Sequence, residues 1–358
     1  MSQQCCNNCF EDPHLQNQIL HLMAKPPIDG QYKECHYCGS ECSVFFDSKE
    51  LEEYFGIFLE CYVPVADGTS DAKSLAECID EDWRVFNRRL PSASKNALLT
   101  DILGDRMREK GYLFSRKKYD DHSSWDSFRN ELLHTNRWFT GNKIDTESLK
   151  SVITQLTVEP KEIGDISTEW YRVRLAPDQT SNFSFEEMGA PPSEKVGPGR
   201  ANPPGISYLY LASDEETALA EVRPHPGDIA YIATFDISNP KSKKAIRAID
   251  LRAPRERISP FIYDEAEKIE VAMQAVSILD SFAVQLTKPV HPDAAPIEYT
   301  PSQYLCELVK SLHYSGVIYR SSVSSGANIA LFSPEDFDAN PRVVKKIINK
   351  ISVEATSI

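Results

Sequence analysis

Arginine, tyrosine and glutamate follow one another at short intervals in the middle of the chain. Arg200 lies in a Gly/Pro-rich loop, Tyr210 ends a strand-like run, and Glu221 follows the helix start after it. The intervals are ten and eleven residues, so a loop, a strand end and a first helical turn can bring these side chains into one cleft. A few arginines in such a cleft can dominate the local field and bind a small anionic ligand.

Two further arginines precede this stretch in an alternating run. Residues 170–175 read Trp-Tyr-Arg-Val-Arg-Leu, and this pattern predicts a strand with Arg172 and Arg174 on one face. The two arginines could bind an anion together, or they could form the solvated face of the strand. Spacing alone favours neither interpretation.

The first forty residues contain two C-x-x-C pairs, Cys6 with Cys9 and Cys35 with Cys38. Two such tight turns can deliver four thiolates to one tetrahedral zinc ion, and Gly39 suits the bend after the second pair. We therefore expect a structural zinc site, because four cysteines would close the coordination sphere. Cys5 and Cys42 are substitute ligands, and a set of free, partly buried thiols is the alternative to zinc.

A second candidate for catalysis lies in a predicted helix over residues 124–139. It reads Arg129-Asn-Glu-Leu-Leu-His134. An arginine and a polar residue followed by this histidine resemble the catalytic motif of HEPN ribonucleases, in which the pair acts across a helical dimer. Alternatively, Arg129 pairs with nearby acidic residues and His134 lies on the helix surface.

Composition limits the classes of function. The chain has 358 residues and a formal net charge of −14, so two domains are expected, and broad attraction to nucleic acid or an anionic membrane is not. No apolar run reaches the length of a membrane span, and the best candidate, residues 269–286, predicts a buried or amphipathic helix. The polar N-terminus lacks a signal-peptide core, so we expect a cytoplasmic protein with mostly reduced cysteines.

The order of helical and strand-like patterns predicts an α+β protein. The predicted segments are a Cys-rich zinc-binding segment at 1–48, a helical domain at 49–160, a mixed α/β domain at 161–340 and a helical tail at 341–358. The polar stretch 157–168 is the predicted connection between the two larger domains. In the mixed domain, Ser213 or Asp214 is the predicted cap of a helix that contains Glu221.

Several motifs in this order resemble the RES domain family, which is named for an arginine, a glutamate and a serine. They are Gly199-Arg200-Ala-Asn202-Pro, Leu209-Tyr210-Leu-Ala, Thr217-Ala218-x-x-Glu221, Tyr299-x-x-Ser302-Gln303-Tyr304 and Gly316-Val-Ile-Tyr-Arg-Ser321. The resemblance extends from about Trp170 to Phe332. The N-terminal cysteines and helices look like an extension found on some RES proteins, sometimes described as HEPN-related.

The resemblance implies an ADP-ribosyltransferase-like fold that degrades NAD by glycohydrolysis or phosphorolysis. Motif matching implies four active-site residues: Arg200 for the diphosphate, Tyr210 beside the ribose or nicotinamide, Glu221 for the cation that develops on the ribose, and Ser321 for phosphate or ribose hydroxyls. Ser322 is the alternative to Ser321. Arg172 and Asn202 are the implied NAD contacts.

The same resemblance implies partners. RES proteins often act as toxins paired with an antitoxin that covers the active site, so we expect NAD, phosphate, a protein antitoxin and a second copy of the chain. Two other functions stay open on the sequence alone. One is a ribonuclease built on Arg129 and His134, and the other is a non-catalytic regulatory binding module.

Overall fold

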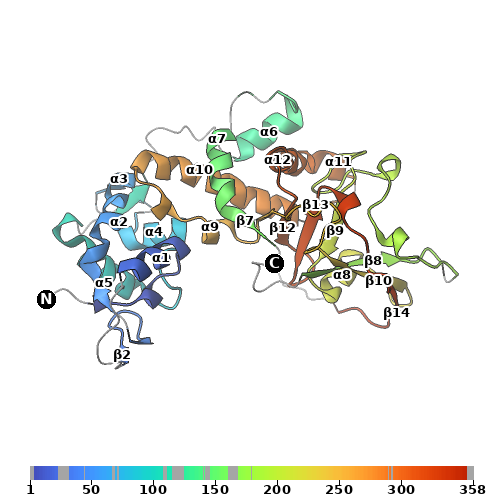
Figure 1. The fold of residues 1–358 in the computed structure, drawn as a ribbon. Helices are drawn as coiled ribbons and strands as arrows, with labels where there is room; N and C mark the ends of the chain where they lie inside the picture. The colour runs from blue at the N-terminus through green and yellow to red at the C-terminus, as the bar shows by residue number, and fades with distance from the viewer. Residues whose placement is uncertain are drawn as a thin grey trace. The chain divides into compact units, whose positions relative to one another are not determined.

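The computed structural model describes residues 4–22, 32–43, 45–66, 69–70, 72–107, 111–114, 125–139, 141, 146–159, 168–178, 180–288, 290–291 and 293–352. The chain divides into two compact units. Unit 1 consists of Met1–Ser124, Ile144–Gln155 and Pro254–Ile278, and unit 2 consists of Trp125–Lys143, Leu156–Ala253 and Leu279–Ile358. Each unit is therefore built from segments that are far apart in the sequence (Figure 1).

Unit 1 is mainly helical. Its helices are α1 (Pro13–Leu22), α2 (Glu52–Gly56), α3 (Phe58–Cys61), α4 (Leu75–Trp83), α5 (Ser92–Leu103), α7 (Thr146–Ile153) and α9 (Pro254–Arg257). Helix α4 shows why they form: Ser74 and Glu77 make a reciprocal capping box, and Leu75, Ile79 and Trp83 bury one face. The predicted helices of this region are present, at somewhat different bounds.

Short strand pairs were not expected in unit 1. The structure pairs β1 (Gln4–Cys5) with β4 (Phe46–Asp47), β2 (Lys33–Glu34) with β3 (Glu41–Cys42), and β5 (Tyr62–Pro64) with β6 (Tyr112–Phe114). A strand of two or three residues is too short to show an alternation of apolar and polar side chains. These strands form because segments distant in sequence pair with each other.

Helix α10 (Ala266–Thr287) is the longest helix described, and the division between the units falls within it. Its length and composition alone would permit it to cross a membrane, contrary to the expectation from the sequence. Half of its most apolar window is buried inside the protein, as in the core helix of a globular domain.

Unit 2 is built on a mixed eight-stranded sheet in the order β14-β10-β8-β9-β13-β12-β11-β7 (Figure 1). The strands are β7 (Thr157–Val158), β8 (Glu169–Leu175), β9 (Leu209–Ala212), β10 (Ile229–Asp236), β11 (Ala248–Asp250), β12 (Gly316–Arg320), β13 (Ala327–Leu331) and β14 (Val344–Ile347). Among the strand pairs of this sheet in the described residues, β11 and β12 alone are parallel. The helices of this unit include α6 (Trp125–His134), α8 (Glu215–Glu221), α11 (Ala295–Glu298) and α12 (Thr300–Ser311). The predicted α+β class is confirmed.

Strand register sorts the side chains of the central strands onto two faces. Leu211 pairs with Ile329, and Ile329 with Ile318, so these three share one face and pack in the larger core. The opposite face carries Ala212, Asn328 and Tyr319, which are paired in the same way. This second face is the one that α8 covers, because Ala218 of the helix packs with Ala212.

The predicted helical tail at 341–358 is wrong over residues 344–347. These residues form β14 at the edge of the sheet, where Ile347 pairs with Ile229 of β10. Pairing with a strand more than a hundred residues away overrides the local helical pattern. The predicted connection at 157–168 begins in β7, and its residues 160–167 lie outside the described residues, as do residues 353–358 of the predicted tail.

Candidate functional site

A cavity of about 410 Å³ opens on the face of the sheet beneath α8. Such a volume lies within the range of small-molecule sites. Its polar lining includes Arg172, Arg200, Tyr210, Glu221, Tyr319 and Asn328. Four of the residues singled out in the sequence therefore meet there. Ser322 lines the cavity as well, whereas Ser321 and Asn202 lie behind the lining.

The cavity exists because two strands separate. Strands β8 and β9 are joined only through the pairing of Tyr171 with Ala212. In place of further strand pairing, Nη1 of Arg172 donates a hydrogen bond to the carbonyl oxygen of Tyr210 at 3.1 Å. The side chain thus satisfies a backbone acceptor at the gap while it lines the cavity.

Arg172 is a cation without a counter-charge among the described residues. Its Nε atom is buried and has no hydrogen-bond partner, and the structure shows no ion pair to it. Desolvation lowers the pKa of Arg172 to about 10, and the positive charge of Arg174 acts in the same direction. An anionic ligand in the cavity would supply the missing partner. Arg174 does not line the cavity and donates instead to the carbonyl of Gly189.

Arg200 is held by the end of a helix. Its Nη1 donates to the carbonyl oxygens of Leu286 at 2.8 Å and Lys288 at 2.9 Å, where the last turn of α10 leaves acceptors free. Its Nη2 lies 3.5 Å from Oγ of Ser322, and the guanidinium lies over the ring of Tyr299. One edge of the Arg200 guanidinium therefore forms hydrogen bonds within the protein. Arg200 forms no ion pair with a carboxylate in the described part of the chain.

Glu221 ends α8 rather than starting it. Asp214 caps the helix by accepting a hydrogen bond from the amide of Thr217 at 2.8 Å, so Glu221 is its last residue. Oε1 of Glu221 accepts from Oγ of Ser321 at 2.7 Å and from Nδ2 of Asn328 at 2.6 Å. Both donors bind the same oxygen. The Glu221 carboxylate is thereby held in one orientation, and Ser321 acts on it rather than on the cavity itself.

Tyr210 and Asn202 together fix the loop that carries Arg200. The Tyr210 hydroxyl donates to Oδ1 of Asn202 at 2.7 Å and accepts from the amide of Ala201 at 3.1 Å. Asn202 is buried and donates to the carbonyls of Gly197 and Pro203. At Gly199 a Cβ atom would lie only 2.2 Å from Oδ1 of Asn202, so only glycine fits there. The loop is rigid around Arg200 for this reason.

Sequence reasoning did not single out several lining residues as site residues, among them the polar residues Asn328 and Tyr319. Asn328 and Tyr319 face each other across β13 and β12 and lie on the cavity side of the sheet. Tyr319 precedes Ser321 by two residues, so alternation along the strand is the signal that could have identified it. Asn328 required knowledge of strand pairing.

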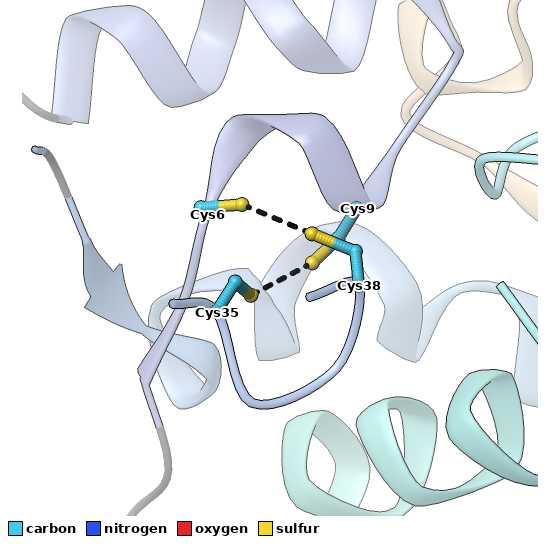
Figure 2. A group of neighbouring side chains, drawn as sticks. All are labelled: Cys6, Cys9, Cys35 and Cys38. Carbon is cyan, nitrogen blue, oxygen red and sulfur yellow. Dashed lines mark hydrogen bonds between the residues drawn. The ribbon is translucent and has the colours of Figure 1, made fainter. Parts of the chain in front are cut away.

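The four predicted zinc ligands come together in unit 1 (Figure 2). The Sγ atoms of Cys6, Cys9, Cys35 and Cys38 all lie within 4.8 Å of one another. Cys6 approaches Cys38 at 3.4 Å, and Cys9 approaches Cys35 at 3.5 Å. Four thiolates at about 2.3 Å from a zinc ion would lie at comparable separations. The donor set and its geometry therefore fit zinc.

The backbone turns of the two pairs explain this convergence. The amide of Cys9 donates to the carbonyl of Cys6, and the amide of Gly39 donates to that of Cys35, with Gly39 in the left-handed region at φ +67°. Hydrogen bonding to Cys6 lowers the pKa of Cys35, while hydrogen bonding to Cys35 raises the pKa of Cys6. Cys5 and Cys42, the substitute ligands, lie outside the cluster.

The ribonuclease alternative rests on two residues of α6 in unit 2. The Arg129 guanidinium forms an ion pair with Glu298 of α11, and His134 is the exposed last residue of the helix. Positions five apart on a helix differ by well over a quarter-turn, so the two side chains do not share a face. This alternative stays a prediction, and no contact favours it.

The family model described as the RES domain matches residues 169–350, just over half of the chain and the part that contains the whole cavity. A comparison with curated proteins finds no match. Among solved structures, the chain is similar to the crystal structure of the M. tuberculosis MbcT–MbcA toxin–antitoxin complex. The similarity covers 57% of this chain and 93% of that chain, at 16% sequence identity and a TM-score of 0.31.

Proposed function

Because this chain belongs to the RES domain family, we propose that it cleaves the bond between nicotinamide and ribose in NAD. One observation carries the proposal: a single cavity joins a fixed carboxylate, Glu221, to two guanidinium groups that form no ion pair with any carboxylate among the described residues. NAD offers the complementary groups, an anionic diphosphate and a ribose on which positive charge develops.

The proposed chemistry follows from the residue types. Arg172 and Arg200 bind the diphosphate and so fix the ribose in the cavity. As the bond between C1′ and the pyridinium nitrogen breaks, the bonding pair goes to nitrogen, and nicotinamide leaves as a neutral molecule. Glu221 stabilises the oxocarbenium-like ribose that remains. Phosphate, or water that then releases a proton to solvent, forms the new bond at the same carbon, which gives the 1″-phosphate of ADP-ribose or ADP-ribose itself.

The direct test is release of nicotinamide by the full-length protein. We expect release from NAD by the wild type and a loss of about 100-fold or more for Glu221→Gln, because the developing cation loses its counter-charge. Reactions with and without phosphate, analysed by mass spectrometry, separate hydrolysis from phosphorolysis. Glu335→Gln is a matched control, since Glu335 is exposed and lies outside the cavity. Intact NAD under both conditions would refute the proposal.

We further propose that the activity serves a toxin or phage-defence role, held in check by a protein antitoxin that covers the cavity. The support is the family resemblance together with the open mouth of the site. The expectation is growth arrest and falling NAD when the wild type is induced in bacteria, but normal growth with Glu221→Gln. Arrest at unchanged NAD would point to another activity.

For the cysteine cluster we propose a structural zinc ion held by Cys6, Cys9, Cys35 and Cys38. Metal analysis of the purified protein is expected to give about one zinc per chain, and Cys35→Ser is expected to lower both the zinc content and the melting temperature. Cys306→Ser, which changes a buried cysteine of α12 outside the cluster, is the control for zinc content. Full zinc occupancy in Cys35→Ser would exclude this ligand set.

A further inference from the structure

Two tyrosines that line the cavity differ in what their hydroxyls contact. The hydroxyl of Tyr210 is fully used within the protein, because it donates to Asn202 and accepts from the amide of Ala201. The hydroxyl of Tyr319 has no hydrogen-bond partner among the described residues. Yet Tyr319 is only 4% exposed. Tyr319 lines the cavity, and its hydroxyl is not among the fully enclosed polar atoms, so the cavity gives it access to solvent or to a ligand.

Strand register places Tyr319 beside the fixed carboxylate. Tyr319 of β12 pairs directly with Asn328 of β13, so their side chains are neighbours on the same face of the sheet. Asn328 in turn donates to Oε1 of Glu221 at 2.6 Å. The charges of Glu221 and Arg200 both reach the Tyr319 hydroxyl. Tyr319 thus lies where the groups with proposed roles converge.

Its surroundings keep this phenol neutral. Desolvation raises the pKa of Tyr319 well above its usual value, and Tyr210 and Glu221 act in the same direction. At neutral pH the side chain is a hydrogen-bond donor and carries no charge. Because the protein offers this donor no acceptor, a bound ligand with an acceptor oxygen can form a hydrogen bond with it without displacing any protein contact.

We propose that Tyr319 is a substrate-binding residue whose hydroxyl donates a hydrogen bond to an oxygen of the nicotinamide-ribose half of NAD. The inference rests on the proposed function and deepens it. The family resemblance implies that Tyr210 contacts the ribose, and we assign this contact to Tyr319 instead. Tyr210 then acts as a positioning residue, which holds the loop of Arg200 through Asn202.

Matched phenylalanine substitutions in the full-length protein test this assignment. For Tyr319→Phe, we expect kcat/KM for NAD and the calorimetric affinity for NAD to fall about tenfold, at an unchanged melting temperature, because no protein hydrogen bond is lost. For Tyr210→Phe, we expect a lower melting temperature, because two hydrogen bonds to the loop are lost. Tyr314→Phe is a control outside the cavity and is expected to leave kcat/KM unchanged.

The possible outcomes separate this inference from the function on which it rests. If the wild type cleaves NAD and Tyr319→Phe equals it in kcat/KM and in affinity, the role of Tyr319 is refuted and the proposed function stands. A lower melting temperature for Tyr319→Phe would also refute it, because it would reveal a structural role. If the wild type neither binds nor cleaves NAD, both proposals fall.

Discussion

A single oxygen atom, Oε1 of Glu221, accepts hydrogen bonds from one loop residue and one strand residue, both a hundred or more residues away in sequence. Ser321 and Asn328 both donate to it, which leaves Oε2 without a donor among the described residues. Two donors on one oxygen fix the rotation of the carboxylate. Ser321 therefore contributes in this structure by orienting the glutamate.

Asn328→Ala is expected to lower kcat about tenfold while KM changes little, because the carboxylate loses one of its two fixed donors. Steady-state kinetics on NAD measure this split. Asn239→Ala, an exposed asparagine outside the cavity, is the control. An Asn328→Ala variant with wild-type kcat would show that Ser321 alone is sufficient to position Glu221.

The charge of Arg172 is expected to lower the stability of the folded protein and to strengthen the binding of NAD. Its folded-state pKa, about 10, is lowered by desolvation, so the folded protein disfavours the charged form. This unfavourable contribution is fully present below about pH 10 and disappears as the guanidinium loses its proton between the folded and the unfolded pKa. Arg172→Met is therefore expected to raise the melting temperature at pH 7, while it weakens NAD binding at least tenfold.

Measurements across pH check the sign of this effect. Thermal unfolding should show the gain of Arg172→Met at pH 7 and a smaller gain near pH 10, while NAD affinity of the wild type stays level from pH 7 to 9. A variant that is less stable than the wild type at pH 7 would show that the hydrogen bond from Arg172 to Tyr210 outweighs the desolvation of the charge.

At the scale of elements, the sequence was a good guide where local chemistry sets the structure. The cap at Asp214, the strand ending near Tyr210 and the turns of the two cysteine pairs all follow from local residue types. Strand pairing was not visible. The separation of β8 from β9, which opens the cavity, and the contact between Asn328 and Glu221 depend on register. For the same reason, residues 344–347 were expected to be helical and instead form an edge strand.

The chemistry of the candidate site could be predicted in part. Arg172, Arg200, Tyr210 and Glu221 were selected from spacing and resemblance, and the fold places them in one cavity. Their individual contacts were not predictable. The hydroxyl of Tyr210 donates its hydrogen bond to Asn202 of the loop rather than to a ligand. One edge of the Arg200 guanidinium donates to carbonyl oxygens at the end of α10. This contact was not predictable, because those carbonyls lie more than eighty residues away in sequence.

At the scale of the whole molecule, the family match and the compact units do not coincide. The RES match begins at residue 169, but residues 254–278 within it belong to unit 1. There Phe261 packs against Phe55 and Phe58, and Ser259 donates to buried Asp12. The N-terminal part of the chain is therefore completed by a segment from the middle of the RES region.

Deletion of residues 1–160 is expected to yield an aggregating or poorly folded protein, because it uncovers apolar side chains of residues 254–278 such as Ile258 and Ile269. Size-exclusion chromatography and NAD cleavage by the truncated chain measure this. The full-length chain purified in parallel is the control. A monodisperse, fully active fragment would mean that the RES region folds without its N-terminal partner.

The position of Asn328 also has a consequence for biosynthesis. A ribosome makes Arg172, Arg200 and Glu221 well before it makes Ser321 and Asn328, which follow Glu221 by 100 and 107 residues. Until β13 has left the exit tunnel and entered the middle of the sheet, the carboxylate has neither of its donors and the cavity lacks one wall. The proposed cleavage of NAD therefore requires β13 to have joined the sheet, because only then is the Glu221 carboxylate held by Asn328.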